Sequence, residues 1–103
     1  PLDFIIRPFT DPKSYHTFQT YIVAFNKNIN AIYLLQELKN KGIQAQITNF
    51  ALHHEPIFNS IDYCPISLNA HFHTIVLPMF YELKESEIDY IVKTLKEIIT
   101  RLN

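Results

Sequence analysis

Histidine and cysteine are the residues of this sequence that could take part in metal binding or nucleophilic catalysis. Neutral imidazole and thiolate are ligands that zinc prefers, yet zinc sites usually pair cysteines two residues apart or histidines four apart on a helix. Neither spacing occurs here. On a strand, two of the histidines would share a face and a third could complete a metal site, so this alternative stays open beside exposed or core-bonded histidines. The residues concerned are His16, His53, His54, His71, His73 and Cys64.

A lone cysteine beside a histidine can also act as a catalytic thiolate. Cys64 precedes Pro65 in a predicted loop, where no helix start is expected to favour the thiolate. A buried, unreactive cysteine is the more common case. We therefore predict no catalytic residue in this chain and no metal ligand.

Phosphate chemistry and nucleic-acid binding are disfavoured by the composition. Gly42 is the only glycine, whereas phosphate-cradling loops need several. The chain has 9 basic and 10 acidic residues and no basic run, so aromatic residues such as Phe18, Tyr21 and Phe25 are expected to pack in a core rather than stack on bases. Glu85, which opens an acidic cluster, is explained by the dipole of a predicted helix.

Length and hydrophobicity predict one domain. The 103 residues are 48% hydrophobic, which suffices for a single core. No apolar run approaches the roughly 20 residues that span a bilayer. The single cysteine favours a cytoplasmic protein, and the start at Pro1, without Met or a signal pattern, suggests a piece of a longer one.

The elements that must position these residues follow from hydrophobic patterning. Prolines in residues 1–14 predict an extended lead-in or linker, and residues 15–103 are predicted to form the domain. Aromatic and β-branched residues predict a strand over 15–25. Shorter strands are predicted over 43–48 and over 74–77, which ends at Pro78.

Helices are predicted between these strands and after them. Apolar residues at helical spacing predict a helix that begins near Ala31 and is stopped by Gly42, and a second over about 85–102. A short third helix is predicted over 65–73 with Pro65 in its first turn. The fold class is therefore α+β: a small, mostly antiparallel sheet of about three strands in a split β-α-β arrangement, the third strand between the first two, with two main helices on one face.

Four stretches together resemble the DegT/DnrJ/EryC1/StrS family of pyridoxal-phosphate-dependent sugar aminotransferases. SYHTFQTYIV resembles the family's strand with a tyrosine-histidine or tyrosine-glutamine pattern, and LLQELKNKGIQAQI its helix-to-strand step through glycine-isoleucine. TNFALHHEPIF resembles a loop with leucine-histidine followed by proline and an aromatic residue. TIVLPMFYELKESEIDYIVKTLKEII resembles the closing segment, in which leucine-proline ends a strand and a helix opens with acidic residues.

This resemblance implies a C-terminal small domain that flanks the active site of an enzyme transferring an amino group to a nucleotide-linked keto sugar. It further implies that pyridoxal phosphate and the catalytic lysine belong to a larger N-terminal domain, that the chain alone is not catalytic and holds no cofactor, and that the whole protein is a homodimer. The loop 49–58 is then expected to face the sugar, with His53 as the best polar contact. Further substrate-binding candidates are Asn49, Phe50, His16 and Gln19.

Two aspects of the resemblance leave alternatives open. Many relatives have a histidine-tyrosine pair where this chain is read as Asn49 and Phe50, and Phe50 has no hydroxyl to donate. An altered sugar, lost activity or a loop that merely closes on its own core are all compatible with this difference. A stand-alone α+β binding or interaction module without catalysis is the alternative from another functional class.

Overall fold

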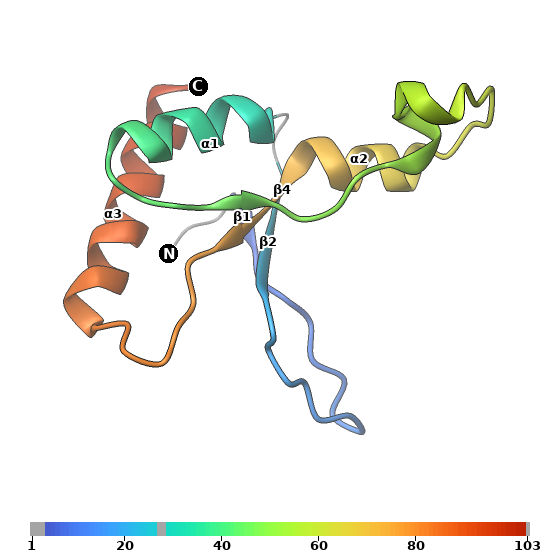
Figure 1. Ribbon diagram of the computed structural model, residues 1–103. Coiled ribbons are helices and arrows are strands. Elements are labelled where there is room, and N and C mark those ends of the chain that lie inside the picture. Colours follow the sequence, from blue (N-terminus) through green and yellow to red (C-terminus); the bar gives the residue numbers. More distant parts are fainter. Residues whose placement is uncertain (1–3, 27–28, 103) are drawn as a thin grey trace.

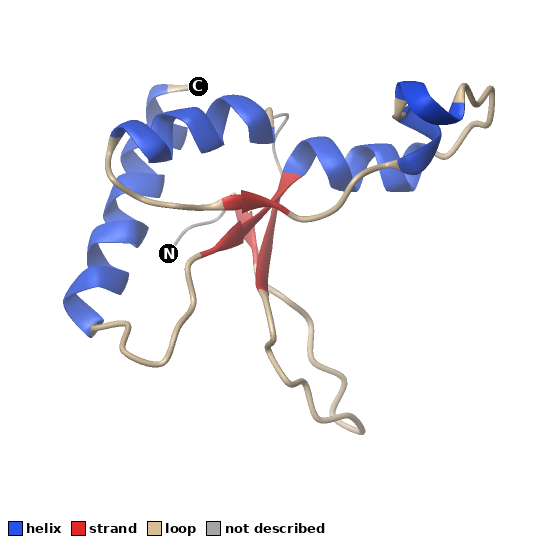
Figure 2. Cartoon of the chain, in the orientation of Figure 1, coloured by secondary structure: helices blue, strands red, loops and turns tan. Residues whose placement is uncertain are grey.

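The computed structural model describes residues 4–26 and 29–102 (Figures 1 and 2). Pro1 of the predicted lead-in, and positions 27 and 28 of the predicted turn, lie outside the described residues. In these residues the chain forms four strands, three α-helices and two short 3-10 helices. Their order is β1 (Ile5–Ile6), β2 (Tyr21–Phe25), α1 (Ala31–Asn40), β3 (Gln46–Ile47), η1 (Leu52–His54), η2 (Pro56–Phe58), α2 (Pro65–His73), β4 (Thr74–Leu77) and α3 (Glu85–Arg101).

The strands form one antiparallel sheet in the order β1-β2-β4-β3. The prediction that the last strand lies between the two earlier ones is confirmed, because β4 pairs with both β2 and β3. The sheet has four strands rather than about three, since Ile5 and Ile6 of the predicted lead-in pair with the end of β2. The α+β class and the mostly antiparallel sheet are confirmed.

One face of the sheet carries the core. Val23 and Ile75 are opposite each other in the register and both are buried. Helices α1 and α3 lie on the same side of the sheet, as predicted, whereas α2 extends away from it (Figure 1). The core cluster consists of Val23, Phe25, Ile29, Ala31, Leu34, Leu38, Ile43, Ile75, Ile91, Leu95, Ile98 and Ile99.

Helix α1 begins and ends at the residues that its sequence signals predict. The Asn30 side chain accepts hydrogen bonds from the amides of Ile32 at 2.9 Å and Tyr33 at 3.2 Å, which satisfies amides that have no partner inside the helix. Gly42 has a φ of 78°, a left-handed conformation that glycine adopts without steric cost. The Ile43 amide then donates to the Leu38 carbonyl at 2.9 Å and turns the chain toward β3.

The predicted strand over 15–25 is wrong for its first six residues, because β2 begins only at Tyr21. The Phe18 amide donates to Nδ1 of His16 at 2.9 Å, and Phe18 has a φ of 49°, which no β-strand accommodates. This local turn replaces the regular pairing that the aromatic and β-branched residues indicated. The predicted strand over 43–48 is likewise shorter, with only Gln46 and Ile47 paired to β4.

Helix α2 passes directly into β4 at Thr74, whose backbone is extended. Both elements have the predicted bounds. His71 and His73 therefore stand on a helix, where residues two apart point in different directions, and not on the strand that would have given them a common face. Helix α3 ends one residue earlier than predicted, and its first turn is fixed by a hydrogen bond from the Lys84 amide to the Glu87 carboxylate at 2.9 Å.

Candidate functional site

The segment between β3 and α2 carries the principal site candidates. It folds into the short helices η1 and η2, which follow each other with only Glu55 between them. Pro56 opens η2, and Asn59, in a left-handed conformation with φ of 44°, ends it. Figure 1 shows this segment, in green and yellow-green, next to the end of α2 that is farther from the sheet. A loop held in two tight turns can present side chains at fixed positions.

A depression of about 760 Å³ lies against this segment. His53 is half-buried in its wall, and Phe50 lines it with 58% of its surface exposed. No hydrogen bond joins His53 to another residue in the described part of the chain, so both ring nitrogens are available to a bound molecule. The full lining is Phe50, Leu52, His53, Phe58, Asn59, Ser60, Ile61, Asp62, Cys64 and Ser67.

Further polar residues that line the depression were not predicted as contacts. Ser60 donates to the Asp62 carboxylate at 3.0 Å and accepts from the Asp62 amide at 3.1 Å, which forms a small polar turn in the lining of the same depression as His53. Ser67 joins them from the first turn of α2. The only sequence signal for these residues is the cluster of turn-forming residues between Pro56 and Pro65.

The other three predicted contacts lie outside this depression. Asn49 is exposed, and its side-chain oxygen accepts a hydrogen bond from the Thr48 hydroxyl at 2.9 Å. His16 and Gln19 belong to the segment between β1 and β2, which extends from the sheet in a different direction from the η1 and η2 segment (Figure 1). His16 lines a separate hollow of about 320 Å³. The structure therefore brings together His53 and Phe50 but not His16 or Gln19.

Metal and thiolate sites gain no support from the geometry. Within residues 4–26 and 29–102, no group of three histidine, cysteine or acidic side chains is placed to hold a metal ion. Cys64 is the N-cap residue of α2, so the helix predicted over 65–73 begins directly after it, but the Cys64 side chain makes no capping hydrogen bond. Cys64 and His53 line the same depression without a hydrogen bond between them.

A family model described as the DegT/DnrJ/EryC1/StrS aminotransferase family matches residues 2–96. The chain belongs to this family. The family that the sequence motifs resembled is thereby confirmed. A pleiotropic regulatory protein of Geobacillus stearothermophilus is 31% identical over 100 residues, which are 92% of this chain and 26% of that protein.

Two solved aminotransferase structures share the fold. The aminotransferase TlmJ of Streptoalloteichus hindustanus superposes with a TM-score of 0.84 at 16% identity, over 99% of this chain and 28% of its own. The putative sugar aminotransferase Spr1654 of Streptococcus pneumoniae, in its PLP form, gives a TM-score of 0.84 at 18% identity, over 97% of this chain and 27% of its own. This DegT/DnrJ/EryC1/StrS chain thus spans about a quarter of the length of the proteins it resembles.

The described residues of this family member do not fit pyridoxal phosphate by themselves. A lysine that binds the cofactor covalently has to stand in a pocket that tunes its amine. Lys13, Lys39, Lys41 and the three lysines of residues 84–96 are all exposed. No lysine lines the depression that contains His53. In the described residues no helix is long and apolar enough to cross a bilayer.

Proposed function

We propose that residues 15–103 are the C-terminal small domain of a pyridoxal-phosphate-dependent aminotransferase that acts on a nucleotide-linked keto sugar, and that this domain shapes the sugar side of the active site. The observation that carries the proposal is the family match over residues 2–96 in a chain only a quarter as long as its relatives. Within the domain, the loop around His53 is the part proposed to face the sugar.

The geometry of the depression supports a sugar as its occupant. A sugar presents many hydroxyl groups that both donate and accept hydrogen bonds, and it presents apolar ring faces. The depression offers the His53 ring and the Ser60 and Asp62 pair together with the apolar surfaces of Phe50 and Phe58. This combination of a few polar groups on an apolar wall is typical of small-molecule sites.

The proposal assigns the remaining chemistry to other parts of a longer protein. Pyridoxal phosphate, when bound, supplies an electron sink for amino-group transfer. Its lysine and phosphate contacts would come from a large N-terminal domain, and the complete enzyme would be a cytoplasmic homodimer. Asn49, Phe50, His16 and Gln19 remain proposed substrate contacts secondary to His53.

Spectroscopy and a coupled assay on two proteins test the proposal. The full-length product of the reading frame and the 103-residue chain are each mixed with pyridoxal phosphate, and the absorbance of protein-bound cofactor is recorded. The full-length protein should bind it and should transfer the amino group of glutamate to a nucleotide-linked keto sugar. Cofactor binding by the short chain alone, or a reading frame that starts near Pro1, would contradict the proposal and favour a stand-alone binding module.

A further inference from the structure

His71 is a buried polar side chain that the proposed substrate contacts do not include. It stands in the last turn of α2, with 8% of its surface exposed. Its Nδ1 atom lies 2.8 Å from the backbone carbonyl oxygen of Asn49, a residue 22 positions earlier in the chain. Helix α2 is thereby tied to the start of the loop that carries His53.

The direction of this hydrogen bond fixes the tautomer of His71. A backbone carbonyl can only accept, so the proton must be on Nδ1 and the neutral ring must have its lone pair on Nε2. A second proton bound at Nε2 would leave the Nδ1 bond to Asn49 intact. The contact therefore holds the loop in both protonation states of His71.

Neighbouring residues of the same turn contact the loop at further points. The Phe50 ring lies 6.1 Å from the His71 ring between centroids, and His54 meets Phe72 edge to face at 5.5 Å. Beside them, the hydroxyls of Thr48 and Thr74 share a hydrogen bond of 2.8 Å. Contacts at Thr48, at Asn49 and Phe50, and at His54 thus bracket His53 from both sides.

We propose that His71 is a positioning residue: its Nδ1–H bond to the Asn49 carbonyl sets the conformation of loop 48–54 and so fixes where His53 stands in the depression. The structural part of this inference stands on the contacts of the loop alone. Its consequence for a sugar substrate rests on the proposed function. The occupant of the depression is the same sugar class proposed above.

Two substitutions with amide side chains distinguish the loss of this hydrogen bond from the general effects of replacing His71. In His71→Asn the side-chain amide nitrogen occupies nearly the place of Nδ1, so the bond to Asn49 can persist. In His71→Gln the amide lies one bond further out, near the place of Nε2, so the bond is lost. His73→Gln is the matched control, because Nδ1 of His73 also bonds a backbone carbonyl at 2.8 Å, but that of Ile29, before α1.

The first measurement uses the chain itself and does not depend on enzyme activity. Nitrogen chemical shifts of wild-type His71 should show the proton on Nδ1, and circular dichroism checks that each variant is folded. The amide of His54, which donates to the Ala51 carbonyl at 2.9 Å, reports on the loop. Its hydrogen exchange should accelerate about tenfold or more in His71→Gln, but less than about threefold in His71→Asn and His73→Gln.

Three results would overturn the inference: a wild-type His71 ring with its proton on Nε2 and none on Nδ1, unchanged exchange in His71→Gln, or equal acceleration in His73→Gln. The tautomer measurement uses the wild-type chain, so it tests the inference even if His71→Gln does not fold. In the full-length protein, His71→Gln should raise KM for the keto sugar about tenfold with kcat within about twofold, and His71→Asn should restore KM. A protein that lacks transaminase activity but shows the expected exchange pattern would refute the proposed function and leave the loop anchor standing.

Discussion

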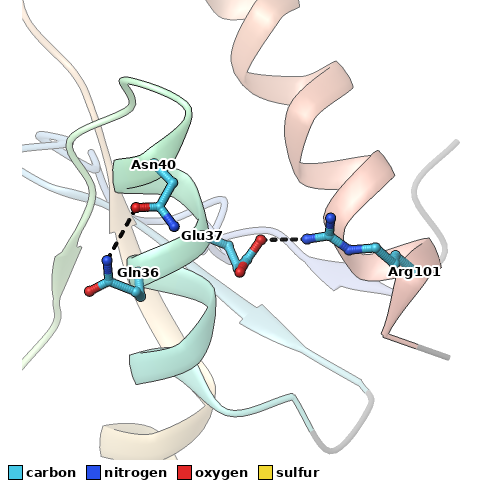
Figure 3. Close-up of polar contacts among 4 residues, drawn as sticks. All are labelled: Gln36, Glu37, Asn40 and Arg101. Atoms are coloured by element: carbon cyan, nitrogen blue, oxygen red, sulfur yellow. Dashed lines mark hydrogen bonds and ion pairs between the residues drawn. The ribbon is translucent and has the colours of Figure 1, made fainter.

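Arg101, in the last turn of α3, donates a hydrogen bond from its guanidinium group to the carboxylate of Glu37 on α1 (Figure 3). On the same helix, the Gln36 side chain donates to Asn40 at 3.2 Å. The ion pair joins the two helices that cover the sheet, yet 59% of the Arg101 side chain is exposed. Water therefore screens most of the attraction between the two charges.

Breaking this ion pair should have a small, salt-sensitive effect. A double-mutant cycle with Glu37→Gln and Arg101→Gln should give a coupling of about 0.2 to 1 kcal/mol in the free energy of unfolding, smaller at high ionic strength. Urea denaturation measures it. Glu97→Gln is the control, since Glu97 is exposed on α3 and forms no ion pair in the described residues. A coupling above about 2 kcal/mol would show that the ion pair is far better shielded from water than its exposure indicates.

Substitution of Gly42 should lower the free energy of unfolding only because of the backbone conformation at this position. Its φ is 78°, and a Cβ atom placed there meets nothing within 4 Å. We expect Gly42→Ala to lower the free energy of unfolding by about 1 to 2 kcal/mol, and Gly42→Asn by less, because asparagine tolerates the left-handed region better than alanine. Denaturation curves of both variants test this. A larger loss for asparagine than for alanine would contradict the conformational explanation.

The core under α1 should be sensitive to truncation. Leu34 is completely buried in the core cluster, whereas Ile32 on the same helix is 54% exposed. Leu34→Ala should destabilise the chain by about 2 to 5 kcal/mol, and Ile32→Ala by less than about 1 kcal/mol. Both substitutions introduce a good helix former, so the comparison isolates packing. Similar losses at the two positions would mean that the core is not where the structure places it.

The helices and the strand order could be predicted because their signals are local or follow general rules. Asn30 and Gly42 mark the ends of α1 by chemistry that the sequence displays directly. The place of β4 between β2 and β3 follows from the rules for crossover connections in small sheets. Strand β1 could not be predicted in the same way, because two residues carry no periodicity and are defined only by their pairing with β2.

The candidate site was predictable only where a motif exists. His53 and Phe50 came from a resemblance to a family loop, and the structure places both in one depression. His16 was predicted on a strand, but Nδ1 of its ring accepts a hydrogen bond from the Phe18 amide. The chain makes a turn there and does not continue as a strand. His71 and Asn49, by contrast, come into contact only through the tertiary structure, and no spacing in the sequence predicts such a contact.

His53 provides the most direct test of the proposed sugar pocket. It is half-buried in the wall of the depression and makes no hydrogen bond to another described residue, so removing its ring should cost little stability. In the full-length protein, His53→Ala should raise KM for a nucleotide-linked keto sugar about threefold to tenfold, which corresponds to one lost hydrogen bond.

The KM for the amino donor and the affinity for pyridoxal phosphate should stay unchanged in His53→Ala, because the cofactor is proposed to be held by the other domain. Asn69→Ala is the control for surface substitution, since Asn69 is exposed on α2 and does not line the depression. Steady-state kinetics with each substrate varied in turn distinguish the two variants. If His53→Ala leaves the sugar KM unchanged while the enzyme is active, the sugar lies elsewhere, and the hollow beside His16 becomes the next position to test.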